Sequence, residues 1–424
     1  MATQTSETPE QERYRIYVLG MLCLVYALNF LDRQLLSIVA EPVKQELALS
    51  DTQLGLLTGL AFALVYTLLG VPVAMLADRT NRVRIVSAAC AIWSTFTVLS
   101  GMAGSFVVLA LARAGVGLGE AGGSPPSYSI VSDYFPEQKR GMAVAVLTSA
   151  IPIGVMLGSI IGATIAAIYG WRYAFVALGV VGLIVAPLLL FTVKEPPRGQ
   201  YDKASAPAPA GNPFRNLGFF FRNKVLVMAA AASSLTTTVG YALLAWGPAM
   251  LMREKGADFG DLALFYSFAI GGALFVGTFG TGVLVDRLGK KSLAYYALVP
   301  GLAALAAAPF LAGFALAPGW PLALASLMAA TAFATSYFTA SMTIVQNEVK
   351  PHQRATASAL LLFFTNLLGL GFGPLIVGAA SDAYADTGHG LVYGILVLVP
   401  LSVAAFLVQF PLIGVLRRRT GWGE

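Results

Sequence analysis

Four ionisable side chains interrupt long apolar stretches of this chain: Asp32, Arg33, Arg113 and Glu120. A charge at the centre of a bilayer costs about 3 kcal/mol on insertion scales, so such residues pair with one another and usually mark a pathway. Two carboxylates and two guanidiniums balance to zero. Because arginine can hold an anionic group and a buried carboxylate can take up a proton, we predict an anion and proton site here.

The helical repeat indicates where these four side chains point. Arg113 and Glu120 are seven residues apart, which is two turns, so they face the same way. Asp32 and Arg33 point about 100° apart around their helix and cannot both face one partner. We therefore expect the four residues to gather as one neutral cluster facing an aqueous crevice, with only one member of the Asp32–Arg33 pair pointing into it.

Other polar residues accompany this cluster. Tyr26 and Asn29 lie on roughly the same helix face as Arg33 and would add a phenol and an amide to its wall. After Glu120 the run Gly-Gly-Ser-Pro-Pro-Ser at 122–127 weakens the helix. Broken helices at this depth expose backbone carbonyls where substrates or ions bind.

Our hypothesis for the mechanism is an exchange of partners. Arg33 and Arg113 would hold an anionic headgroup, while Glu120 or Asp32 takes up a proton as its arginine turns to the substrate. Burial and an adjacent arginine move the proton affinity of a carboxylate in opposite directions, so losing a partner can change its protonation. The alternative is a static ion network that only locks two helices together.

The composition explains why these charges lie in lipid. The 424 residues are 57% hydrophobic and only 11% charged, whereas about a quarter of the residues of a soluble domain are charged. The net charge of +6 comes from short basic clusters between apolar runs, which excludes a nucleic-acid-binding stripe. Cys23 and Cys90 both fall inside apolar runs, so we expect no disulfide, no metal site and no cofactor.

Twelve apolar segments are long enough to cross a bilayer, and each must be helical because backbone amides find no water in hydrocarbon. They run over residues 17–39, 54–77, 85–105, 107–130, 141–168, 173–193, 225–252, 262–285, 292–314, 320–345, 355–380 and 391–416. If the chain starts inside, 21 of its 27 Lys and Arg residues lie in the cytoplasmic tails and loops, and the outer loops hold only Lys44, Arg172, Arg253 and Lys255. This asymmetry predicts an inner (plasma) membrane protein with both termini in the cytoplasm.

The sequence also predicts two halves. Residues 194–224, rich in Pro, Ala and charge, would form a cytoplasmic linker between a six-helix bundle at 1–193 and another at 225–424. Internal repeats of this kind indicate a two-lobed carrier with its site between the lobes.

One motif occurs in both halves. Asp78-Arg79 follows the second span, and Asp286-Arg287 follows the eighth, 208 positions later. At cytoplasmic helix ends these residues can pair with neighbouring helix termini, so we expect a gating role for all four.

These doubled Asp-Arg loops resemble the Gly-x-Leu-x-Asp-Arg-x-Gly-Arg-Lys signature of the major facilitator superfamily. The second copy fits closely, while the first has Ala74 and Asn81 where the signature has glycine. Arg113, followed by glycines at 115, 117 and 119, resembles the arginine motif of that superfamily's fourth helix. The resemblance implies an all-α membrane protein with twelve transmembrane helices in two pseudo-symmetric six-helix bundles.

Three stretches resemble the Spinster family within that superfamily: Asn29-Phe30-Leu31-Asp32-Arg33, Ala77-Asp78-Arg79-Thr80-Asn81-Arg82, and Arg113 through Glu120-Ala121. That family is associated with proton-dependent export of lysophospholipids and sphingolipid phosphates. The resemblance implies a proton-coupled, alternating-access transporter for an amphiphilic anionic lipid. A proton-coupled multidrug or organic-anion exporter is the alternative.

Other classes of protein fit less well. The sequence has no nucleophile elbow, no HExxH and no GxxxxGK[ST] loop, so we expect no enzyme. A passive channel would not need paired repeats around a charged midplane. We expect the partners to be a small-molecule or lipid substrate, protons and the bilayer, with no nucleic acid, and the chain to be a monomer.

Overall fold

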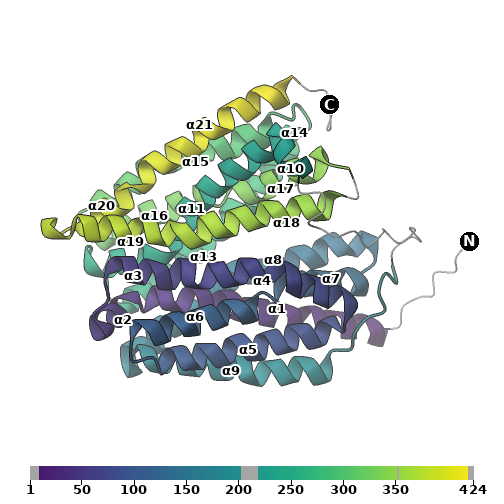
Figure 1. Ribbon diagram of the computed structural model, residues 1–424, viewed down its shortest axis with the longest axis horizontal. Helices are drawn as coiled ribbons and strands as arrows, with labels where there is room; N and C mark the ends of the chain where they lie inside the picture. Colours follow the sequence, from purple (N-terminus) through teal and green to yellow (C-terminus); the bar gives the residue numbers. More distant parts are fainter. Residues whose placement is uncertain (1–8, 202–217, 351–352, 419–424) are drawn as a thin grey trace, which may run out of the picture.

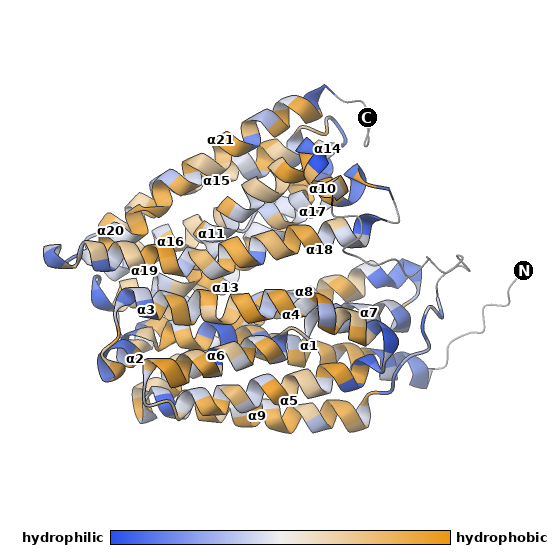
Figure 2. Cartoon of the chain, viewed as in Figure 1, coloured by the Kyte–Doolittle hydropathy of each residue, from blue (hydrophilic) through white to orange (hydrophobic). Residues whose placement is uncertain are grey.

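The computed structural model describes residues 9–201, 218–350 and 353–418. Within them, twelve helical stretches are long and apolar enough to cross a membrane, as predicted. The first residues of α1 and the last of α21 lie at the same end of the molecule (Figure 1). We call this the termini end, and the opposite one the distal end. Hydrophobic residues extend along the helices, and hydrophilic ones gather towards their ends (Figure 2).

The helices form two bundles, which we call the first and second lobes (Figure 1). The first lobe contains α1 (Pro9–Ile38), α2 (Ala40–Leu47), α3 (Asp51–Gly55), α4 (Ala61–Arg79), α5 (Arg82–Gly101), α6 (Phe106–Glu120), α7 (Ser124–Tyr134), α8 (Glu137–Tyr169) and α9 (Trp171–Thr192). The second contains α10 (Gly218–Arg222), α11 (Lys224–Arg253), α12 (Phe259–Asp261), α13 (Ser267–Phe275), α14 (Thr281–Gly289), α15 (Tyr295–Leu316), α16 (Trp320–Ala334), α17 (Tyr337–Glu348), α18 (Arg354–Phe364), α19 (Gly373–Ala383), α20 (Gly390–Leu396) and α21 (Leu398–Arg417). Residues 202–217 of the predicted linker lie outside the described residues, so the linker and the domain boundaries that it sets stay a prediction.

Matching local features mark the two lobes as repeats. Ser50 begins α3 with a capping box, and Asp258 begins α12 with another, 208 positions later. In such a box the side chain accepts from the third backbone amide of the helix, which would otherwise lack a partner. A π-helical segment follows each cap, over Leu56–Leu60 and Leu262–Tyr266. The pseudo-symmetry inferred from the Asp-Arg loops therefore extends to the distal helix ends.

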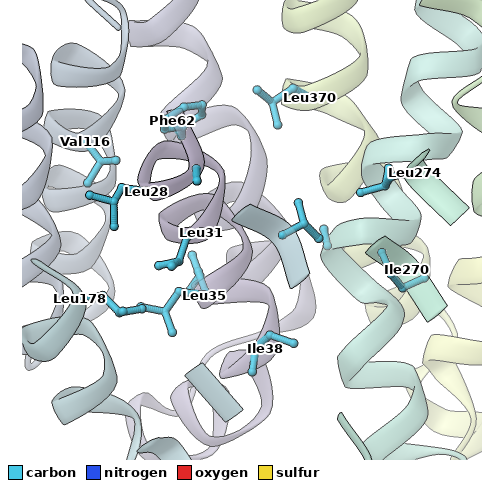
Figure 3. Packing of buried hydrophobic residues seen from close by; sticks show 14 of the residues in the cluster. Leu28, Leu31, Leu35, Ile38, Phe62, Val116, Leu178, Ile270, Leu274 and Leu370 are labelled. Atoms are coloured by element: carbon cyan, nitrogen blue, oxygen red, sulfur yellow. The ribbon is translucent and has the colours of Figure 1, made fainter. Parts of the chain in front are cut away.

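Glycines bring the helices of the first lobe close together. A Cβ built at Gly158 of α8 would lie 2.8 Å from the carbonyl oxygen of Leu31, and one at Gly119 of α6 would lie 2.4 Å from the backbone nitrogen of Trp93. Only glycine permits such approaches without a shift of the backbone. Leu31 and its neighbours on α1 lie inside the packed interior of this lobe (Figure 3). Helix α8 thus packs closely against α1, and α6 against α5.

Candidate functional site

The four intramembrane charges meet as two ion pairs between α1 and α6. The Nε of Arg33 donates to Oε2 of Glu120 at 2.6 Å, and Nη1 of Arg113 donates to Oδ2 of Asp32 at 3.1 Å. The hydroxyl of Thr97 on α5 donates to the other oxygen of Asp32 at 2.6 Å. Asp32 and Arg33 thus turn to different partners, as the helical repeat requires.

The two pairs are withdrawn from solvent to different degrees. Side chains of Glu120 and Arg113 are 0% and 2% exposed, whereas that of Arg33 is 12% exposed. Removing one partner of a buried pair leaves the other charge without compensation, so each pair strongly favours the observed position of α1 relative to α6. Arg33 is therefore the member of the four that is most accessible.

Aromatic rings surround the guanidinium of Arg33. Its Cζ lies 5.0 Å from the ring centre of Phe30, 4.8 Å from that of Phe62 and 4.7 Å from that of Tyr66. Cations are attracted to ring faces at this distance, most strongly where water is excluded. Tyr241 of α11 is also in electrostatic contact with Arg33, so the second lobe reaches the same group.

A cavity of about 290 Å³ lies between the lobes and is lined by residues of both. Arg33 and Arg113 are the charged residues of its described lining, and the other lining residues are uncharged: aromatic, aliphatic, hydroxyl-bearing or amide. Asp32 and Glu120 do not line it. One member of the Asp32–Arg33 pair thus reaches the cavity, while Glu120 lies behind Arg33, the side chain that it binds.

The two accompanying residues separate in the same way. Tyr26 lines the cavity, and its hydroxyl lies 3.4 Å from that of Tyr128. Asn29 is 2% exposed and is not part of the cavity lining, so it does not contribute to the cavity wall as predicted. Its amide instead lies beside Gly123 of the first lobe, 3.9 Å from the position of a Cβ added there.

The predicted helix break after Glu120 is confirmed. Helix α6 ends at Glu120, and α7 begins at Ser124 with Pro125 and Pro126 in its first turn. Proline lacks an amide hydrogen and is favoured at the first positions of a helix, which explains why α7 starts here. Glu120 thus stands at a helix end beside Gly122 and Gly123.

The second lobe supplies polar but uncharged residues to the cavity. Thr237 and Tyr241 of α11, Tyr337 of α17 and Asn366, in the π-helical segment Thr365–Phe372, line it. The charges on the cavity wall therefore lie in the first lobe alone. Tyr66 and Tyr128 were not identified from the sequence as cavity residues. Tyr66 follows Phe62 by one helical turn, and this aromatic pair on one helix face was the available signal.

The predicted gating residues lie at the termini end. Asp78, Arg79, Asp286 and Arg287 are all exposed, and no ion pair of theirs is recorded within the described residues. The guanidinium of Arg198 donates to the carbonyl oxygens of Ala77 and Thr80, both at 2.7 Å. Their gating role stays a prediction.

A second charged cluster, missed from the sequence, joins the lobes at the distal end; we call it the distal seal. Arg253 of α11 donates to Asp51 of α3 at 2.7 Å and to Glu41 of α2 at 2.9 Å. Asp382 of α19 accepts from the backbone amides of Asp51 and Thr52, at 2.9 and 2.7 Å. All of these contacts cross between the lobes. Asp382 also occupies the positive N-terminus of α3.

Backbone meets backbone beside this seal. A Cβ at Gly55 would lie 2.6 Å from the carbonyl oxygen of Pro374, and one at Gly59 would lie 2.6 Å from that of Gly371. The helices of the two lobes touch here without intervening side chains. The cavity is therefore closed from the distal end by a tight contact and by ion pairs.

Removing one member of the Asp32–Arg113 pair should destabilise the protein. Arg113→Leu strands a buried carboxylate, and we expect a loss of about 3–5 kcal/mol. Adding Asp32→Asn removes that charge and should recover part of the loss. Thermal unfolding in lipid nanodiscs measures both, with Arg84→Leu on the exposed part of α5 as the control. A melting temperature of Arg113→Leu equal to that of the wild type would contradict the expectation.

Comparison with known proteins agrees with the fold. Residues 22–374 match the Major Facilitator Superfamily. An MFS-type efflux pump of Mycolicibacterium smegmatis is 35% identical over 367 residues, which are 87% of this chain and 84% of the pump. Protein spinster homolog 1 of Xenopus tropicalis is 28% identical over 393 residues, which are 87% of this chain and 73% of that protein.

A solved structure is also closely similar. The crystal structure of a bacterial homologue of the human lysosomal transporter Spinster, in an inward-facing and unoccupied conformation, superposes with a TM-score of 0.88 at 30% identity. The match covers 98% of this chain and 100% of that one. The chain is a membrane transporter and not an enzyme, and it belongs to the major facilitator superfamily, with the fold of the bacterial Spinster homologue.

Proposed function

We propose that this secondary transporter moves an amphiphilic anion, such as a lysophospholipid or sphingosine phosphate, in exchange with or together with protons. The observation that carries the proposal is the cavity between the lobes, whose described lining has two arginines as its charged residues. The rest of the described lining is uncharged and includes many aromatic and aliphatic side chains. A ligand with one anionic end and one apolar end fits both.

The anionic end would bind at Arg33 and Arg113. Both guanidiniums reach the cavity while one side of each is occupied by a carboxylate. A guanidinium has five donors in a planar fork, so each retains donors for a phosphate or carboxylate. The aromatic rings around Arg33 hold it in place before the ligand arrives, which lowers the entropic cost of binding.

The apolar end would lie along the aliphatic lining. Ile151 and Val155 of α8 face the cavity from the first lobe, and Leu244 and Leu274 do so from the second. An alkyl chain that lies along these side chains gains free energy by leaving water. The contrast between a cationic wall and an uncharged one thus favours an amphiphile.

Proton coupling would follow from competition for Arg33. When an anionic headgroup binds this guanidinium, Glu120 loses part of its compensation while it stays completely buried. An isolated buried carboxylate is strongly disfavoured, so proton uptake accompanies substrate binding. Asp32 is the second candidate for the proton carrier, and its carboxylate keeps its hydrogen bonds to Arg113 and Thr97. In the alternative, the two pairs only lock α1 to α6.

Alternating access would involve both ends of the molecule. In this conformation the distal seal separates the cavity from the distal side, so we propose that the cavity communicates with the termini end. Opening the distal end would require breaking the Arg253 contacts, with Asp78, Arg79, Asp286 and Arg287 closing the termini end in return. The linker at 194–224 would let the bundles 1–193 and 225–424 move relative to each other.

The basic loops support an orientation and a location. We propose an inner (plasma) membrane protein, functional as a monomer, with its termini end in the cytoplasm. Among the described residues, the basic side chains at the distal helix ends are Lys44, Arg172, Arg253 and Lys255.

A proton-coupled exporter of organic anions or of several drugs is the second candidate. The relative named as an efflux pump supports it, and the phenol-rich wall would accept planar solutes. In both candidate functions the substrate carries a negative charge. They differ in whether an alkyl chain is needed for binding.

Binding measurements separate the candidates. We expect the purified protein in nanodiscs to bind lysophosphatidylglycerol or sphingosine phosphate and to reject the lipophilic cation tetraphenylphosphonium, because two cavity arginines repel it. Arg33→Gln should weaken anion binding on the order of tenfold, the value expected for one charged hydrogen bond. The control is Arg84→Gln, which is exposed on α5. Tighter binding of the cation than of the lysolipids would refute the proposal.

Glu120→Gln tests the proton role. The amide keeps the shape of the side chain and cannot titrate, so we expect uptake driven by a pH gradient to fall to the background level. Exchange of labelled for unlabelled lysolipid across proteoliposomes at equal pH should continue. Unchanged pH-driven transport in Glu120→Gln would remove the proton role from this residue and favour the static alternative.

Arg253→Ala tests the distal seal. The substitution removes both interlobe ion pairs, and we expect a larger population of conformations open at the distal end. Spin labels at Gln45 and Asp386, in a chain with its two cysteines replaced by serine, measure the distance between the lobes there. Lys255→Ala is the matched control, because Lys255 donates to Ala315 and Ala317 within its own lobe. An unaltered distance distribution in Arg253→Ala would speak against a gate at this end.

A further inference from the structure

Two completely buried side chains of the first lobe have polar atoms without a protein partner. Glu120 is 0% exposed and Asn29 is 2% exposed. Within the described residues, Oε1 of Glu120 and both amide atoms of Asn29 have no hydrogen-bond partner. Buried polar groups of native proteins are nearly always hydrogen-bonded, to protein or to ordered water.

These atoms lie beside the same short stretch of backbone. Asn29 precedes Arg33, the partner of Glu120, by one helical turn. A Cβ built at Gly123 would lie 3.9 Å from Nδ2 of Asn29 and 3.3 Å from the carbonyl oxygen of Glu120. The amide of Asn29 therefore faces the break between α6 and α7, close to where the Glu120 side chain starts.

The space beside Asn29 lies at Gly123 and not at Gly122. A Cβ added at Gly123 would stay at least 3.3 Å from its neighbours, whereas one at Gly122 would lie 2.9 Å from the Cβ of Ala89. Helix α7 starts only at Ser124. A buried water is stable where it can make two to four hydrogen bonds. One carboxylate oxygen and one amide with both a donor and an acceptor meet that requirement.

We propose that Asn29 holds an internal water against the free oxygen of Glu120, and that this water delivers the proton to Glu120. The proposal rests on the proton role of Glu120 given above. The water accepts a proton on its cavity side and gives another to Oε1, so the carboxylate becomes a neutral acid and the water is unchanged. Asn29 acts as a positioning residue.

The other approaches to Glu120 cannot relay a proton. Its Oε2 accepts from Arg33, and a guanidinium has donors only, so it cannot take up and pass on a proton. Asp32 is engaged by Thr97 and Arg113. The unpartnered oxygen is thus the remaining entry for a proton.

The cavity lies close to this entry. Ser124 follows Gly123 directly and lines the cavity together with Tyr26. Tyr26 in turn lies 3.4 Å from Tyr128, which also lines the cavity. Hydroxyl groups both accept and donate, so they can connect cavity water to the internal water.

The charged and titratable groups around Glu120 come from four helices. Asp32 and Arg33 belong to α1 and Arg113 to α6, while Tyr66 of α4 and Tyr241 of α11 interact with Arg33. Helix α5 contributes the apolar Trp93 at Gly119 and Gly123. None of the substitutions below alters these groups.

Infrared spectroscopy can follow the proton without knowledge of the substrate. After a rapid drop in pH, protonation of Glu120 in nanodiscs appears as a carboxylic acid band that is missing in Glu120→Gln. We expect Asn29→Leu, which fills the space with an apolar group, to slow the rise of this band roughly tenfold or more. Asn29→Ser keeps a hydroxyl for the water and should restore a rate close to that of the wild type.

The outcomes separate this inference from the proposed function. If the band never appears in the wild type, the proton role of Glu120 fails and the relay fails with it. If it appears equally fast in the wild type and in Asn29→Leu, the relay alone is wrong. A second measurement needs no Asn29 variant: the wild type minus Glu120→Gln difference spectrum should contain the O–H stretch of one internal water, and its absence would overturn the proposal.

Discussion

In the interior of a membrane protein no bulk water solvates a guanidinium, so Arg33 and Arg113 depend on the carboxylates of Glu120 and Asp32. That dependence requires α1 and α6 to stay in one relative position. The close contacts at Gly158 and Gly119 allow this position, because they bring α8 against α1 and α6 against α5. The packing of the first lobe thus serves to keep four charges in register, and two of them remain available to the cavity.

The two lobes share local structural features but differ in their distribution of charge. Equivalent places in the two lobes hold the capping boxes at Ser50 and Asp258 and the π-helical segments that follow them. The intramembrane ion pairs nevertheless occur in the first lobe, and the second offers hydroxyls and an amide. A ligand between the lobes would therefore be held by charge on one side and by shape and dispersion on the other.

The sequence was sufficient for the twelve spans, the all-α fold and the break after Glu120, since each depends on local composition. It also indicated that Asp32 and Arg33 need separate partners. It did not indicate that Glu120 and Asn29 lie behind the cavity wall, because the packing of neighbouring helices decides which side chains reach the cavity. The distal seal was missed for another reason: Asp51, Arg253 and Asp382 stand at helix ends, where charge is ordinarily solvated, and only the approach of the two lobes brings them together.

The glycine contacts beside the distal seal bear on how the lobes can move. At Gly55 and Gly59 one helix rests directly on the main chain of another, with no side chains interlocked between them. Two helices in such contact can rotate or slide against each other without a change of side-chain rotamer. The polar contacts of the distal seal would then provide most of the resistance to opening at this end. Water can replace these contacts one at a time, so the lobes can separate here in small steps.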